Sequence, residues 1–169
     1  MPTPPITYEP TQSPPIIVAS GLSPDPRGIL LVGGDEGATE FGITASILSE
    51  DAGEDVKVAL YVDYGLTNAL GQPFRFALQT FPELPPATLA DGPRPLVGVR
   101  WVDGAFPIQP GCHRLTLVAT HEFDTATGCP KHLNDSSQVT WHFQQCDVGE
   151  CPAALEDCPA TDATCPLEP

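Results

Sequence analysis

Hydrophobic and polar residues alternate along much of the middle of the chain. This is the period at which a β-strand turns successive side chains to opposite faces. The alternation is clearest over 41–47, 56–62, 113–123 and 139–143, and it is weaker over 74–78 and 96–102. No stretch shows the 3.6-residue period of an amphipathic helix. Seven or eight short strands in roughly 120 residues are typical of an all-β fold, an antiparallel two-sheet sandwich.

The last two stretches are regular enough to predict how their strands pair. If Leu117 lies opposite Trp141, the apolar side chains of both strands face the core, and a slip by one residue would mix the two faces. The same register places Cys112 opposite Cys146 on the outer face, so we predict a disulfide between these two residues. A slip by two residues would keep the faces and separate the two cysteines.

Proline and cysteine divide the chain into three parts. Residues 1–27 contain eight prolines and indicate an extended leader or linker, in which 16–18 could add a short edge strand. Residues 28–146 form the predicted domain. Residues 147–169 form an acidic tail with a Cys-Pro pair every seven residues, where proline forbids the continuous helix that a heptad would otherwise suggest.

The six cysteines indicate where the protein works. Their number is even and no C-x-x-C motif occurs, so disulfides in an oxidising compartment are expected rather than a zinc ribbon or a redox pair. We expect an extracellular, periplasmic or outer-surface protein. No signal peptide is visible at the N-terminus, so export requires that a signal was already removed or that Met1 is not the native start. Besides the predicted pair, Cys129, Cys151, Cys158 and Cys165 have no assigned partners.

Charge limits the possible partners. The 22 acidic and 7 basic residues give a formal net charge of −15 at pH 7, which argues against binding nucleic acid or an anionic membrane. No apolar run approaches the roughly 18 residues of a transmembrane helix. Protein partners or self-assembly, through the terminal segments or through exposed sheet edges, remain the expected interactions.

The succession TEFGITASILSEDAGEDVKVALYVDYG, GCHRLTLVATHEFD and SSQVTWHFQQCD resembles four strands of an immunoglobulin-like domain. It is similar to immunoglobulin-like or cadherin-like modules of bacterial surface proteins and lipoproteins, over about residues 28–146. The cystine between the sheets of antibody domains is absent, because the first of these strands has no cysteine. The resemblance implies a β-sandwich in a surface setting, and a fold of this kind does not fix a function.

Four carboxylates in six residues form the best candidate for a metal site. Calcium prefers six to eight oxygen ligands, which loops of surface domains often supply. The alternative is an ordinary acidic turn in solvent. The candidate ligands are Glu50, Asp51, Glu54 and Asp55.

Catalytic motifs are not evident in the sequence. Cys112 and His113 are adjacent and therefore face opposite sides of a strand, which argues against a nucleophile–base pair. Trp141 alternates with core residues, whereas Trp101 could be buried or could belong to a sugar platform. We therefore expect a non-enzymatic binding or assembly module, such as a structural subunit of a larger complex or appendage. The alternatives are a calcium-dependent binding module that uses the 50–55 turn, or a hydrolase with an unrecognised site.

Overall fold

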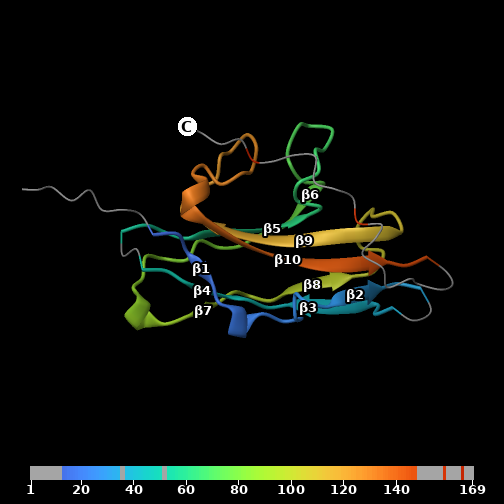
Figure 1. Ribbon diagram of the computed structural model, residues 1–169, viewed down its shortest axis with the longest axis horizontal. Coiled ribbons are helices and arrows are strands. Elements are labelled where there is room, and N and C mark those ends of the chain that lie inside the picture. The colour runs from blue at the N-terminus through green and yellow to red at the C-terminus, as the bar shows by residue number, and fades with distance from the viewer. Residues whose placement is uncertain (1–12, 35–36, 51–52, 148–157, 159–164, 166–169) are drawn as a thin grey trace, which may run out of the picture.

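The computed structural model describes residues 13–34, 37–50, 53–147, Cys158 and Cys165. Within them the fold is all-β, and three short 3-10 turns are its only helical elements: η1 (Ala19–Gly21), η2 (Leu89–Asp91) and η3 (Leu133–Asp135). None of these described turns is long enough and apolar enough to cross a membrane. Two layers of strands lie one above the other, as the sequence pattern predicts (Figure 1).

One layer is a five-stranded sheet with the order β2-β10-β9-β5-β6. The bounds are β2 (Ile29–Val32), β10 (Ser136–Gln145), β9 (Gly111–Thr120), β5 (Lys57–Val62) and β6 (Phe76–Thr80). All neighbours in this sheet are antiparallel except β2 and β10, which run parallel. This pair departs from the antiparallel expectation because the chain enters β2 from the other layer rather than through a hairpin.

The other layer consists of two smaller sheets, and the chain passes directly from one to the other between β3 and β4 and again between β7 and β8. One has the order β1-β4-β7, and the other pairs β3 with β8. The bounds are β1 (Ile16–Ile17), β4 (Ser46–Leu48), β7 (Arg94–Pro95), β3 (Glu40–Ile43) and β8 (Val99–Val102). The short edge strand expected near 16–18 is therefore present as β1. The division at residue 27 stays a prediction, although the indole N–H of Trp141 donates to the carbonyl of Pro24 at 2.7 Å.

The core lies between the layers and follows the alternation of the sequence. Three alternating residues of β5 and the residue directly before the strand are all fully buried: Val56, Val58, Leu60 and Val62. Trp141 and Phe143 face them from β10, and Trp101 from β8 is only 2 % exposed. Trp101 therefore packs in the core, with its ring centroid 4.9 Å from that of Phe143, and forms no sugar platform.

The hairpin of β9 and β10 keeps the predicted faces, but its register is shifted by two residues. Trp141 lies opposite Leu115 rather than Leu117, and Cys112 lies opposite Gln144. The predicted disulfide between Cys112 and Cys146 is therefore wrong. Both registers place the same side chains in the core, so the hydrophobic pattern could not distinguish them.

The cysteines instead connect the tail to the five-stranded sheet. Cys112 is bonded to Cys158, and Cys129 is bonded to Cys165. Cys146 is also in a disulfide. Cys151 lies outside the described residues. The disulfides predicted from the even cysteine count are thus present, with a different connectivity.

A small aromatic cluster covers the outer face of the same sheet. Tyr61 stacks on Phe74 with ring centroids 4.4 Å apart, and both pack with Val118 and Ala59. The loop after β9 folds back over this cluster, since the Tyr61 hydroxyl donates to the carbonyl of Gly128 at 2.8 Å. The hydroxyl of Tyr64 lies 2.8 Å from the sulfur of Cys165. Because the sulfur of a disulfide carries no hydrogen, the tyrosine is the donor of this contact. Cys165 is therefore fixed onto the outer face of the sheet.

Candidate interaction surface

Strand β8 forms an open edge of the second layer. It pairs with β3 on one side, and no strand of the described residues pairs with its other side. The N–H of Asp103 donates to the carbonyl of Thr39 at 2.9 Å, which fixes the phase of the β3–β8 ladder. In an antiparallel pair, the backbone N–H and C=O of successive residues point alternately toward and away from the partner strand. Counting back from Asp103, the backbone groups of Val99 and Trp101 therefore point toward β3. The backbone N–H and C=O of Arg100 then point outward from the open edge.

Apolar side chains accompany this open backbone. Val97 and Val102 are 77 % and 39 % exposed, and they are two of the few large hydrophobic residues exposed in the described chain. We define the β8 edge as residues 97–102. An exposed edge with free backbone groups and apolar side chains is a template for pairing with another strand.

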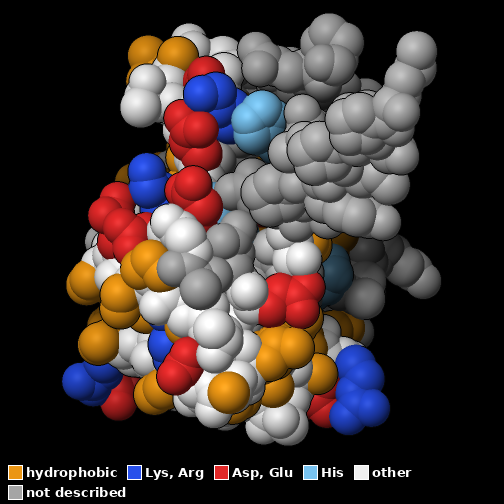
Figure 2. All heavy atoms as spheres, turned by 90° about the vertical axis from the view of Figure 1, so that its left-hand side faces the viewer, with side chains coloured by type: hydrophobic (Ala, Val, Ile, Leu, Met, Phe, Trp, Pro, Cys, Tyr) orange, Lys and Arg blue, Asp and Glu red, His pale blue; other side chains and the backbone are white. Residues whose placement is uncertain are grey.

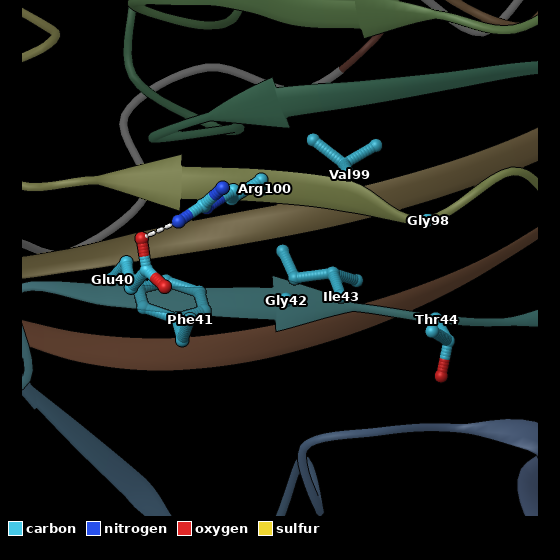
Figure 3. Close-up of a pocket in the computed structure, with 8 residues that line it drawn as sticks. All are labelled: Glu40, Phe41, Gly42, Ile43, Thr44, Gly98, Val99 and Arg100. Atoms are coloured by element: carbon cyan, nitrogen blue, oxygen red, sulfur yellow. Dashed lines mark hydrogen bonds and ion pairs between the residues drawn. The ribbon is translucent and has the colours of Figure 1, made fainter.

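Two hollows flank the β8 edge. The first, of about 390 Å³, lies on the outer face of the β3–β8 pair (Figure 3). It exists because Gly42 and Gly98 have no side chains, and a Cβ placed on Gly42 would meet no atom within 4 Å. The second, of about 420 Å³, lies between β8 and the free edge of β6, with Leu78 and Phe106 among its lining residues. Side chains of an added strand could enter both.

Charge at this surface is balanced locally and negative overall. Arg100 forms an ion pair with Glu40 across the β3–β8 ladder, at one end of the first hollow (Figure 3). On the end of the molecule seen in Figure 2, acidic side chains form several separate groups, with basic side chains beside some of them. With a net charge of −15, the protein presents a negative field to an approaching partner.

The predicted calcium ligands do not form a compact cluster among the described residues. Glu50, Glu54 and Asp55 are exposed in the loop between β4 and β5, and Asp51 lies outside the described residues. Nowhere in the described ranges do three or more carboxylate, histidine or cysteine side chains come together as a metal site would require. Calcium binding by this turn stays a prediction.

Two buried histidine–aspartate pairs are the clearest polar groups that the sequence reasoning missed. The Asp63 carboxylate is fully buried and accepts hydrogen bonds from His113 Nδ1 at 2.9 Å and from Arg75 Nε at 2.8 Å. His113 Nε2 lies 2.7 Å from the carbonyl of Gln109. Since both partners of the ring are acceptors, the two ring nitrogens can donate to both of them at once when the imidazole is protonated.

Burial raises the pKa of Asp63, but hydrogen bonds and positive charge from its neighbours outweigh burial. His113 contributes most, followed by the backbone N–H of Arg114 and the charge of Arg75, and together they hold the pKa below its ordinary value. The second pair joins His121 Nδ1 to Asp135 at 2.5 Å. Neither histidine is hydrogen-bonded to a serine, threonine or cysteine side chain of the described residues, so neither pair has the nucleophile of a hydrolase triad.

Comparison with known proteins adds little. No family model matches the sequence, and no curated protein matches it. Among solved structures, the chain is similar to the CARDB domain of the PF1109 protein from Pyrococcus furiosus, crystallised in complex with di-metal ions. The identity is 17 %, the match covers 70 % of this chain and 86 % of that one, and the TM-score is 0.38. A likeness at this level carries no argument about function.

Proposed function

We propose that the chain is a non-enzymatic binding or assembly module that takes up an extended segment of a partner protein at the β8 edge. The outward N–H and C=O of Arg100 carry this proposal, because a partner strand can add to them without displacing any bond of the fold. The exposed valines on either side offer apolar contact, and the two hollows offer space for alternate side chains of the added strand.

The partner strand is expected to be apolar at its centre and flanked by lysine or arginine. A second copy of this chain would bring another net charge of −15 to the interface, and the repulsion disfavours it. Lysine or arginine residues on either side of the partner strand, in contrast, are attracted by the negative charge of the protein, and this attraction accelerates association. The disulfides support an oxidising setting outside the cytoplasm.

Two substitutions of the same residue test the proposal. Arg100→Pro removes the outward N–H, and Arg100→Ala keeps it. Both remove the ion pair with Glu40, so only the edge backbone distinguishes them. Proline is compatible with an edge position whose N–H faces solvent, so the fold is expected to survive. Val97→Lys blocks the edge in a second way, since edge lysines discourage strand addition.

The wild type and the three variants serve as bait for proteins from the native source, and each captured partner is then measured with purified protein. We expect Arg100→Pro and Val97→Lys to bind at least about tenfold more weakly than the wild type, and Arg100→Ala to bind within about threefold. In the complex, hydrogen exchange at the Arg100 amide is expected to slow. Equal binding by Arg100→Pro and Arg100→Ala, or unchanged exchange at this amide, would refute edge addition. A dimer of the isolated chain in solution would replace the partner with a second copy.

A further inference from the structure

Two of the basic residues stand apart from the others. The chain has seven lysines and arginines, and five of them form an ion pair with a carboxylate: Arg27, Lys57, Arg75, Arg100 and Lys131. Arg94 and Arg114 form no ion pair with a carboxylate of the described residues. In both, Nε and one terminal nitrogen are buried with no hydrogen-bond partner. Arg94 at least donates to the carbonyl of Pro85.

Arg114 lies in a polar part of the outer face of the five-stranded sheet. It is opposite His142 in the β9–β10 ladder. On one side the next outer-facing pair is Cys112 and Gln144, and on the other side Thr116 and Thr140, whose hydroxyls are 2.9 Å apart. Arg114, which is cationic, and His142, which becomes cationic when protonated, thus have hydroxyl and amide groups beside them. Neither faces a carboxylate among the described residues.

The unpaired atoms of Arg114 define the shape of a ligand. Nε and Nη2 lie along one edge of the planar guanidinium group, and their N–H donors together match the two oxygens of a carboxylate or a phosphate. A buried charged donor without an acceptor is unfavourable, and such groups in folded proteins are nearly always satisfied. Burial, and next the charge of Arg114, lower the pKa of His142, so a bound anion would also favour its protonated form.

We propose that Arg114 and His142 form a binding site for one oxyanion, a carboxylate or a phosphate, on the outer face of β9 and β10. The oxyanion has two possible sources. It can be a free anion, or it can be a carboxylate of the acidic tail, because Glu156 and Asp157 directly precede the Cys158 that is bonded to Cys112. Both residues lie outside the described residues. The site is distinct from the β8 edge and does not depend on the proposed function.

The experiment titrates the full oxidised chain with sodium phosphate and with sodium acetate at constant ionic strength. It follows the ring resonances of His142 and the Nε–H resonance of Arg114 by NMR. Four variants accompany the wild type. Arg114→Lys keeps the charge and loses the paired donors, and Arg114→Gln loses both. Arg27→Gln removes the same charge from an exposed arginine already paired with Asp25. The double variant Glu156→Gln/Asp157→Asn removes the carboxylates nearest Cys158.

Saturable shifts of both residues in the wild type, with affinity at least tenfold weaker in Arg114→Lys and unchanged in Arg27→Gln, support a site for a free anion. Saturable shifts only after Glu156→Gln/Asp157→Asn support the site with the tail as its own ligand. The proposal is overturned if neither protein shows saturable shifts. It is also overturned if Arg114→Lys binds as tightly as the wild type, or if Arg27→Gln weakens binding equally. If Arg114→Gln does not fold, Arg114→Lys still decides the outcome.

Discussion

Replacing Asp63 by asparagine is expected to reveal how strongly the buried ion cluster stabilises the fold. Asp63 directly follows β5 and has a positive φ of 53°, which asparagine tolerates about as well as aspartate. The substitution therefore preserves shape and backbone conformation, and it removes mainly the negative charge. The ring of His113 would be left buried without its anionic partner.

The size of the loss follows from the three hydrogen bonds of the carboxylate. The bond from the Arg114 N–H, 3.1 Å long, can be kept by the asparagine oxygen. The bond from Arg75 joins a side chain that is 39 % exposed, so its loss contributes no more than about 1 kcal/mol. The bond from His113 reaches a fully buried carboxylate, and its loss contributes about 2–3 kcal/mol. We expect Asp63→Asn to lower the free energy of unfolding by about 3 kcal/mol, within the range for breaking a buried pair.

The loss is expected to depend on pH with a definite sign. Because the pKa of Asp63 in the folded protein is below its ordinary value of 3.8, its stabilisation is fully present above that value. It is lost as the pH falls through the pKa of the folded state. The contribution of the Asp63 carboxylate to the difference in stability between wild type and Asp63→Asn therefore shrinks below about pH 4. Urea unfolding at pH 7 and at pH 3 measures it.

Asp25→Asn is the matched control. The pKa of Asp25 is also lowered, to about 2, by the hydrogen bond from Arg27, but both side chains are largely exposed. Asp25→Asn is therefore expected to leave stability unchanged. A loss below about 1 kcal/mol in Asp63→Asn at pH 7, or a difference that does not shrink in acid, would refute the electrostatic account of the cluster.

Three further predictions follow from packing and connectivity. The indole N–H of Trp141 donates to a carbonyl, whereas that of Trp101 has no partner among the described residues. In urea unfolding, Trp141→Phe should therefore cost about 1 kcal/mol more than Trp101→Phe, and equal losses would contradict this. Gly128 and Gly71 both have positive φ, but a Cβ at Gly128 would lie 2.8 Å from Phe74, so Gly128→Ala should be less stable than Gly71→Ala by about 1–3 kcal/mol. Equal unfolding midpoints would refute the close contact. Non-reducing peptide mapping should join the tail both to the start of β9 and to the loop after it; a peptide joining β9 to the end of β10 would contradict this connectivity.

The sequence predicts strands and faces well, because alternation is a local property. Val56, Val58 and Leu60 are all buried, as their period of two indicates. The same property limits the prediction of register. A shift of two residues returns every side chain to its own face, so the pattern could not decide whether Trp141 pairs with Leu115 or with Leu117. The cysteine connectivity depended on that choice and could not be predicted.

The β8 edge and the cluster around Asp63 could not be predicted for a different reason. Whether a strand is an edge depends on which distant strands pair with it, and nothing near Arg100 in the sequence records this. Similarly, Asp63 and His113 are 50 positions apart, and only the antiparallel pairing of β5 with β9 brings them together. The one local indication was a buried strand that ends in an aspartate.

The disulfide between Cys129 and Cys165 also determines how the fold would bear tension. A pull on the chain beyond Cys165 passes through the bridge into the loop after β9, so the stretch between the two cysteines, which are 36 positions apart, carries no load. Strand β10 lies within this bypassed stretch. With this bridge and the one between Cys112 and Cys158 both reduced, the same pull would no longer be diverted into β9 and the loop after it, and it would peel β10 from β9 one pair at a time. The oxidised protein would therefore resist a steady force that separates the strands of the reduced one.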